Sequence, residues 1–306
     1  MLDEWPEHPD RLSRARDGGG ALQNPGMHVE AAADPFTAQM LDYYRATAPA
    51  YDDWAGGVHL KAAARVAQLA TINAGDVVVD AGCGTGLLAR VLAAERRHLG
   101  RIIGVDVSLS MLEVAETNRP RDAPVSFGRG VVEHLVLRDK TVDVVVLGLV
   151  LSLVARPEAA LLEARRVLRP GGRIVISETQ RSLLSEVDAM FLAELRDLGT
   201  VFHIPDRPAS HARLGEPQTL AELLHQTGFT DVQTSSMVVG NHTADARTFI
   251  ELMREEGPWT YTMLNLLGPG ARERLEQRLT GTVRFSEEGG PFLYHRPFSF
   301  AVGRRV

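Results

Sequence analysis

Cysteine is almost missing from this sequence, because Cys83 is the single one in 306 residues. One cysteine excludes an internal disulfide framework and is typical of a protein in a reducing compartment. No apolar run reaches the ~20 residues that a membrane-spanning helix needs, and residues 1–20 are too polar for a signal peptide. These absences predict a soluble protein of the cytoplasm, without a membrane partner.

A block of basic residues is also missing. The chain carries 33 Lys and Arg against 39 Asp and Glu, a net charge of -6, so nucleic acid is not expected as a partner. Metal-ligand spacings are missing as well, since two prolines separate His203 from His211 and no H-E-x-x-H accompanies them. The sequence therefore predicts no metal site. It leaves the oligomeric state open, a homo-oligomer included.

The sequence does contain a regular alternation of apolar strands and helices. Strands are expected at 77–81, 101–106, 125–128, 142–148, 173–178, 230–239 and 292–302. Helices are expected from about 35 and at 58–72, 86–96, 107–117, 157–168, 183–199, 219–227, 243–255 and 269–279. Continuous apolar strands that alternate with helices predict a parallel sheet covered on both faces.

The segments between the last three strands are too long for plain connections, so they predict a cap over the sheet. We expect a mobile leader at 1–34, N-terminal helices that form a lid at 35–72, a core at 73–180 that continues at 218–240 and 289–306, and cap insertions at 181–217 and 241–288.

The stretch VVVDAGCGTG, residues 77–86, places an aspartate before three alternating glycines. In a parallel sheet such a loop lies beyond the carboxyl end of a strand, where ligands bind. Glycine lets the backbone turn sharply, and a Cβ at Gly82 or Gly84 would lie where the ligand should. The dinucleotide fingerprint G-x-G-x-x-G is not met, because Leu87 stands at the place of its third glycine.

The negative charge of Asp80 distinguishes between two kinds of ligand. A pyrophosphate would face this carboxylate with like charge, which is costly away from water. S-adenosylmethionine carries an ammonium and a sulfonium group, which the same carboxylate would attract. Asp106 ends the next expected strand and can accept hydrogen bonds from both hydroxyls of a ribose, a feature shared with NAD-binding proteins.

Together these segments resemble the class I S-adenosylmethionine-dependent methyltransferases. VVVDAGCGTG resembles their first motif, IIGVDVSLSML their second-strand acidic motif, and LRPGGRIVISE the turn into their fifth strand. The similarity covers about 51–178 and is closest to the small-molecule branch, and PFLYHRPFSFAVGRR resembles the last strand. The resemblance implies an α/β fold with a doubly wound, seven-stranded, mostly parallel sheet, an antiparallel last strand and a helical cap.

The resemblance also implies which residues hold S-adenosylmethionine. They are Tyr51, Asp80, Gly82, Cys83, Gly84 and Gly86 at the methionine part, Asp106 at the ribose, Val107, Met111 and Val132 at the adenine, and Leu147 and Gly148 at the end of the fourth strand. One position departs from the family. Where an acid often binds the adenine amino group, this chain has Val131, with Glu133 as the nearest substitute.

The acceptor side is less defined. Methyl transfer to a hydroxyl, an amine or an acidic carbon can use a base, and His203 in the cap loop is the candidate. His59, His211, His242 and His295 are more readily read as packing or surface histidines. Tyr43, Tyr44 and Trp54 either line the acceptor site or pack in the core.

Three functions stay open at this point. The first is methyl transfer from S-adenosylmethionine to an O, N or C atom of a small molecule, for example in biosynthesis. The second is a protein of the same fold that binds this cofactor and catalyses another reaction, such as a cyclisation. The third, an NAD-dependent oxidoreductase, is disfavoured by Asp80 and by the glycine spacing.

Overall fold

The computed structural model describes residues 35–95, 100–180, 190–191, 193–195, 213–243, 245–256, 258–282 and 292–306. The expected leader at 1–34 and the loop that carries His203 and His211 lie outside these residues. Within the described residues no helix is both long enough and apolar enough to cross a membrane.

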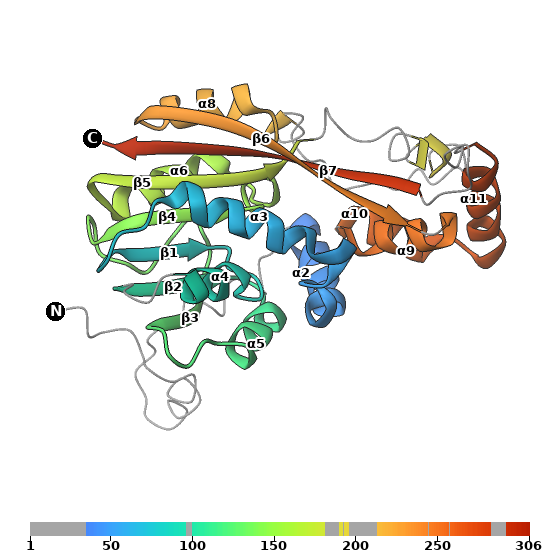
Figure 1. The fold of residues 1–306 in the computed structure, drawn as a ribbon, viewed down its shortest axis with the longest axis horizontal. Helices are drawn as coiled ribbons and strands as arrows, with labels where there is room; N and C mark the ends of the chain where they lie inside the picture. The colour runs from blue at the N-terminus through green and yellow to red at the C-terminus, as the bar shows by residue number, and fades with distance from the viewer. Residues whose placement is uncertain are drawn as a thin grey trace. The chain divides into compact units, whose positions relative to one another are not determined.

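A seven-stranded sheet forms the centre of the molecule (Figure 1), in the order β3-β2-β1-β4-β5-β7-β6. The strands are β1 Val77–Ala81, β2 Arg101–Asp106, β3 Val125–Arg129, β4 Val142–Gly148, β5 Leu168–Thr179, β6 Phe229–Thr243 and β7 Phe292–Arg305. The strands β1 to β5 pair in parallel, whereas β7 runs antiparallel to both β5 and β6. The expected sheet and its antiparallel last strand are confirmed.

Helices cover both faces of the sheet. Neighbouring residues of a strand point to opposite faces, so each strand contributes side chains to two buried clusters. On one face, Val78 packs in a cluster with α3 Trp54–Ala70 and α4 Leu87–Glu95. On the other face, Val79 packs in a second cluster with α6 Pro157–Val167 and α8 Pro217–Gln226. The first cluster matters for the site, since α3 passes over the carboxyl end of β1.

The remaining helices are α2 Pro35–Thr47, α5 Leu109–Thr117, α9 Ala246–Glu256, α10 Pro258–Leu266 and α11 Pro269–Thr282, with short 3-10 turns η2 Ala48–Ala50 and η3 Leu151–Leu153. The expected N-cap of α5 is confirmed, because the Ser108 side chain accepts the backbone N–H of Met111. Helix α10 had no counterpart in the sequence reading.

The turn expected at 169–172 lies inside β5 instead of before it. Val142 pairs with Leu168 and Val144 pairs with Arg173, so β5 carries the intervening residues as a bulge. Gly171 in this bulge has φ +78°, which favours glycine. Arg169 ties the bulge to β4, since its Nη1 lies 2.9 and 3.0 Å from the two carboxylate oxygens of Asp143.

The strands β6 and β7 are longer than expected and continue beyond the sheet as a pair. Their register runs from Phe229 opposite Arg305 to Thr243 opposite Phe292, whereas β5 pairs with β7 only as far as Phe298. The outer part of this pair reaches over α9 and α10 (Figure 1). The expected end of the strand at 239 was therefore too early.

The N-terminal helices are joined to α9 and α10 by side-chain hydrogen bonds. The Tyr43 hydroxyl donates to the Glu255 carbonyl at 2.5 Å, and Trp54 Nε1 donates to the Leu252 carbonyl at 2.7 Å. Gln39 Nε2 donates to Thr262 Oγ1 at 2.9 Å. Tyr43 and Trp54 are buried, so the structure supports the packing interpretation of these two residues.

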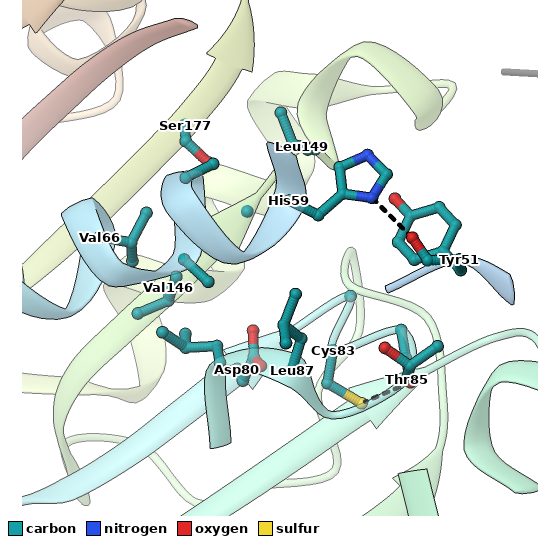
Figure 2. A pocket seen from close by; sticks show the side chains of 16 residues that line it. Tyr51, His59, Val66, Asp80, Cys83, Thr85, Leu87, Val146, Leu149 and Ser177 are labelled. Atoms are coloured by element: carbon teal, nitrogen blue, oxygen red, sulfur yellow. Dashed lines mark hydrogen bonds between the residues drawn. The ribbon is translucent and has the colours of Figure 1, made fainter. Parts of the chain in front are cut away.

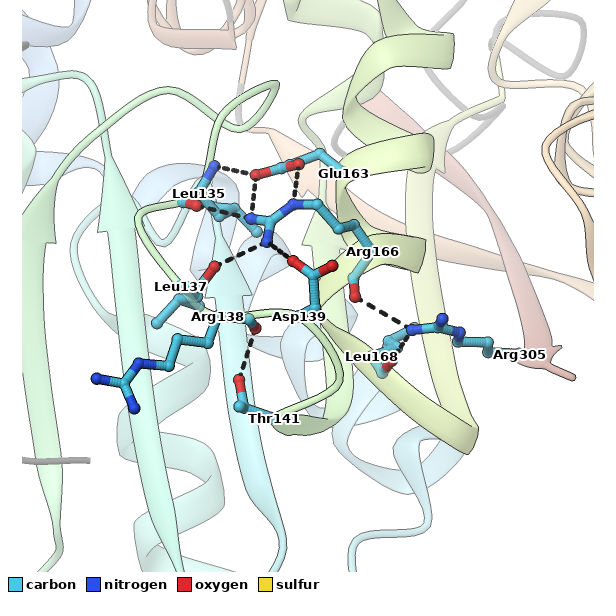
Figure 3. Close-up of polar contacts among 9 residues, drawn as sticks. All are labelled: Leu135, Leu137, Arg138, Asp139, Thr141, Glu163, Arg166, Leu168 and Arg305. Carbon is cyan, nitrogen blue, oxygen red and sulfur yellow. Dashed lines mark hydrogen bonds and ion pairs between the residues drawn. The ribbon is translucent and has the colours of Figure 1, made fainter. Parts of the chain in front are cut away.

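Arg166 on α6 holds the loop between β3 and β4 (Figure 3). Its guanidinium donates to the carbonyls of Leu135 and Leu137, at 3.0 and 2.9 Å, and to the carboxylates of Glu163 and Asp139. Glu163 in turn accepts the backbone N–H of Leu135 at 2.6 Å. One side chain thus satisfies several carbonyls of a loop that has no regular structure of its own.

Candidate functional site

A pocket opens at the carboxyl ends of β1, β4 and β5, beneath α3 (Figure 2). The lining residues come from the segment before α3, from α3 itself, from the glycine loop with the start of α4, and from the ends of β4 and β5. They are Tyr51, His59, Ala62, Ala63, Val66, Asp80, Gly82, Cys83, Gly84, Thr85, Leu87, Leu88, Val146, Gly148, Leu149 and Ser177.

The glycines of the loop are needed for different reasons. Gly82, Gly84 and Gly86 have φ of +83, +53 and +72°, a region that other residues rarely adopt. A Cβ at Gly82 would lie 2.2 Å from Val150, which corrects the expectation that it would enter the ligand space. A Cβ at Gly84 would meet nothing within 4 Å, so Gly84 leaves open room on the pocket side.

Asp80 is a buried carboxylate that faces this pocket. Its exposed fraction is 3 %, and its Oδ2 atom has no hydrogen-bond partner among the described residues. Burial, with a smaller effect from the charge of Asp106, raises the pKa of Asp80 to about 7. An unpartnered buried oxygen is costly, and a cation in the pocket would remove that cost.

Asp106 stands at the end of β2, beside the glycine loop. Its Oδ2 accepts the backbone N–H of Gly84 and its Oδ1 that of Ser108, both at 2.8 Å. Burial raises the pKa of Asp106, and hydrogen bonds from backbone N–H groups oppose this effect. The carboxylate keeps lone pairs for two ribose hydroxyls, because each oxygen can accept more than one hydrogen bond.

The structure brings six of the expected cofactor residues into the pocket, namely Tyr51, Asp80, Gly82, Cys83, Gly84 and Gly148. The Leu147 side chain points away and packs in the second cluster, between the pocket residues Val146 and Gly148. Val132 also packs in that cluster, and Met111 is buried on α5. Gly86, Asp106, Val107, Met111 and Val132 do not line the pocket. Contact of Gly86 with the methionine part, of Asp106 with the ribose and of the other three with the adenine stays a prediction.

Tyr51 and His59 form one wall of the pocket. Their rings are stacked, with centroids 4.2 Å apart and planes at 17°. His59 Nδ1 lies 3.0 Å from the Tyr51 carbonyl oxygen. Burial is the main reason that the pKa of His59 falls to about 4 and that the pKa of Tyr51 rises far above its ordinary value. Both side chains are therefore neutral at physiological pH.

A polar latch connects this wall to the glycine loop. Asp52 accepts the Thr85 hydroxyl at 2.5 Å and also forms an ion pair with Arg90. Arg90 Nη1 donates to the Thr85 carbonyl at 2.7 Å. The segment that carries Tyr51 is thereby tied to the first turn of α4.

Sequence reasoning missed the contribution of α3 to the pocket, along with Thr85 and Ser177. One signal was present, because His59, Ala62, Ala63 and Val66 follow helical spacing and include small residues that let a ligand approach. His203 lies outside the described residues, so its role as a base stays a prediction. Among the described residues, no group of three or more His, Cys, Asp or Glu could hold a metal ion.

Comparison with known proteins agrees with this geometry. Residues 79–176 match the family described as a methyltransferase domain. Demethylmenaquinone methyltransferase of Lactiplantibacillus plantarum is 32% identical over 167 residues, which cover 51% of this chain and 70% of that protein. Malonyl-[acyl-carrier protein] O-methyltransferase of Yersinia pestis is 34% identical over 174 residues, 56% of this chain and 59% of that one.

Solved structures agree on the fold. An S-adenosylmethionine-dependent methyltransferase of Thermotoga maritima superposes with a TM-score of 0.52 at 18% identity, covering 87% of this chain and 100% of its own. The first curated relatives are matched over 44 to 77% of their own lengths. The chain belongs to the class I S-adenosylmethionine-dependent methyltransferases, and S-adenosylmethionine is its cofactor.

Proposed function

We propose that this chain transfers the methyl group of S-adenosylmethionine to an O, N or C atom of a small organic acceptor. The observation that carries the proposal is the Oδ2 atom of Asp80, which is buried, faces the pocket and has no partner among the described residues. A ligand with a positive charge satisfies this oxygen, whereas a pyrophosphate would repel it.

Residues in the pocket and beside it fit the cofactor part by part. Asp80 offers charge to the cationic methionine end, Gly84 leaves room for a close approach, and Asp106 offers carboxylate oxygens to a ribose. When bound, S-adenosylmethionine supplies an electrophilic methyl group on a sulfonium. What the chain then has to do is align the acceptor with that group and exclude water.

The walls that do this come from the N-terminal helices and from the second insertion. We assign α2, Tyr51 and α3 to a lid and α9 to α11 to a cap, because Tyr43 and Trp54 bond the first group to the backbone of α9. The two relatives named above act on demethylmenaquinone and on malonyl-[acyl-carrier protein], so the family alone does not select an acceptor. The single cysteine supports a cytoplasmic setting.

Calorimetric titration tests the cofactor site directly. We expect S-adenosylmethionine and S-adenosylhomocysteine to bind with micromolar affinity and NAD not to bind. Asp80→Asn keeps the shape of the side chain but removes its charge, so it should weaken S-adenosylmethionine more than S-adenosylhomocysteine, which has no sulfonium. Equal loss for both ligands would place Asp80 at the ammonium group, which both carry, and no loss for either would show that Asp80 does not sense the positive charge.

Methyl transfer is tested with methyl-labelled S-adenosylmethionine and a panel of phenols, carboxylic acids and amines. Label in an acceptor, with release of S-adenosylhomocysteine, is the expected result. Conversion of an acceptor without consumption of S-adenosylmethionine would favour the alternative of a non-methylating enzyme on this fold.

A further inference from the structure

We propose that His59 is the base that takes the proton of the acceptor, and that the acceptor is a phenol or an enol. This inference rests on the methyl-transfer function proposed above. It assigns to α3 the role that the sequence suggested for His203 in the cap loop. The argument depends on the tautomer of the His59 ring, on its place in the pocket and on the groups around it.

The tautomer follows from a single hydrogen bond. Nδ1 of His59 lies 3.0 Å from the carbonyl oxygen of Tyr51, and a carbonyl oxygen can only accept. Nδ1 must therefore carry the hydrogen. In a neutral imidazole the other nitrogen, Nε2, then has a free lone pair. Nε2 makes no hydrogen bond with any described residue.

The ring is held in the pocket by its neighbours. It stacks on Tyr51 at 4.2 Å and 17°, and on Trp54 at 5.2 Å and 27°. Only 8% of His59 is exposed, and the residue lines the same pocket as Asp80 and the glycine loop. Stacking on both rings and the bond to the Tyr51 carbonyl restrict rotation of the side chain, as a base that must meet a defined atom requires.

The charged and titratable groups around His59 keep the ring neutral. Burial lowers the pKa most, Arg296 on β7 lowers it further, and the Tyr51 carbonyl and Asp52 oppose these effects. The net result is a pKa of about 4. The lone pair on Nε2 is thus present throughout the neutral pH range, although the base is a weak one.

A weak neutral base fits an acidic hydroxyl better than an alkanol, since proton transfer is most effective between groups of similar acidity. The pocket wall also favours a flat molecule, because the stacked rings of Tyr51 and His59, with centroids 4.2 Å apart, form a flat aromatic surface there. An amine, in contrast, attacks with its own lone pair and needs no base beforehand.

The proposed step balances as follows. The oxygen–hydrogen bond of the acceptor breaks and its proton passes to Nε2 of His59. The electron pair left on the acceptor, on oxygen or on the conjugated carbon, forms the new bond to the methyl carbon. The carbon–sulfur bond breaks with its electron pair on sulfur, which gives S-adenosylhomocysteine. The imidazolium then returns the proton to solvent.

The first test measures which nitrogen of the His59 ring carries the hydrogen. In protein with ¹⁵N-labelled histidine and saturating S-adenosylhomocysteine, His59 should show a protonated Nδ1 and a bare Nε2 between about pH 6 and 8. Phenol or 2-naphthol should shift the Nε2 resonance, whereas cyclohexanol, of similar shape to phenol but far less acidic, should not. A protonated Nε2, or no shift with either phenol in protein that binds S-adenosylhomocysteine, would overturn the proposal.

The second test compares two substitutions. His59→Asn keeps a donor near the position of Nδ1, and His59→Gln places an acceptor oxygen near the position of Nε2, but neither can take a proton. Both should lower the rate of phenol methylation at saturating S-adenosylmethionine by about 10²- to 10⁴-fold, and S-adenosylhomocysteine affinity, measured in parallel, gives the concentration that saturates each variant. His225→Asn, at an exposed position of α8, is the matched control.

Wild-type activity in His59→Gln would show that an acceptor oxygen is sufficient, and the base assignment would fail. Wild-type protein that binds S-adenosylhomocysteine but neither binds nor methylates any phenol would overturn the acceptor class. Failure to bind S-adenosylhomocysteine at all would instead remove the proposed function, so the two failures are distinguishable.

Discussion

The carboxylate of Asp106 accepts the backbone N–H of Gly84 at 2.8 Å. The acid that the sequence assigns to the ribose therefore also holds the glycine loop in position. Its second oxygen accepts the N–H of Ser108, the residue that caps α5. One side chain thus connects the glycine loop and the next helix, at the position predicted to bind the ribose.

Asp106→Ala should consequently affect more than one contact. We expect S-adenosylhomocysteine binding to weaken by at least 10-fold and the free energy of unfolding to fall by about 1–3 kcal/mol, since buried N–H groups lose their acceptor. Calorimetry and urea unfolding measure the two effects. Asp122→Ala, at an exposed position, is the control. Weakened binding with unchanged stability would mean that the loop does not depend on Asp106.

Binding of S-adenosylmethionine should depend on pH through Asp80. The pKa of this carboxyl is about 7 in the free protein, and a bound cation favours its ionised form. Binding below pH 7 must therefore release a proton, and the affinity should fall as the pH is lowered from 8 to about 6. Calorimetry in buffers of different ionisation enthalpy detects the released proton, and Asp80→Asn should abolish the release.

Asp80 should also make stability depend on pH. Its folded-state pKa of about 7 lies above the ordinary value of 3.8, so the folded state binds more protons than the unfolded state between these values. Stability contributed by this group is then full below pH 3.8 and is lost as the pH rises towards 7. Urea unfolding at pH 5 and 8 should show that Asp80→Asn is relatively more stable at pH 8, by about 2–3 kcal/mol. A difference that does not change with pH would contradict the raised pKa.

The latch between Asp52 and Arg90 offers a fourth prediction. Both side chains are partly buried, and the pair also engages Thr85. A double-mutant cycle with Asp52→Ala and Arg90→Ala should give a coupling free energy of about 1 kcal/mol or more. The exposed pair of Asp42 and Arg45 should give a value near zero in the same cycle. Similar couplings for both pairs would show that the latch has no special role.

Arg166 should matter for stability and not for the cofactor. Replacing it by Ala leaves two loop carbonyls without a donor and Glu163 without its cation. We expect a loss of about 2–4 kcal/mol in the free energy of unfolding and unchanged binding of S-adenosylhomocysteine. Chemical denaturation and calorimetry measure the two quantities. Arg121→Ala, at an exposed position, should be neutral.

The parts of this fold that local patterns determine could be predicted from the sequence. The strand at 101–106 was predicted to the residue, because its apolar run ends at an acid and is followed by a helix cap. The lengths of β6 and β7 could not, since their pairing joins residues far apart in the chain. The same limit hid the roles of Tyr43 and Trp54, whose partners are backbone carbonyls of a distant helix.

In the site, too, the residues that follow a local sequence pattern could be predicted, and those that depend on distant contacts could not. The glycine loop and its two acids lie in one short segment and in the strand after it, so their pattern was visible. From the sequence, His59 was interpreted only as a packing or surface histidine. Its importance depends on the Tyr51 carbonyl and on two stacked rings, which only the folded structure brings together.

The position of β7 has a consequence for how the protein is made. Although β7 comes last in sequence among the described strands, it lies between β5 and β6. Until the ribosome has released residues 292–305, both of those strands present open edges to the cell. Open edges are sites of mispairing with other chains. The nascent protein should thus depend most on chaperones in the interval before β7 emerges and pairs with both strands.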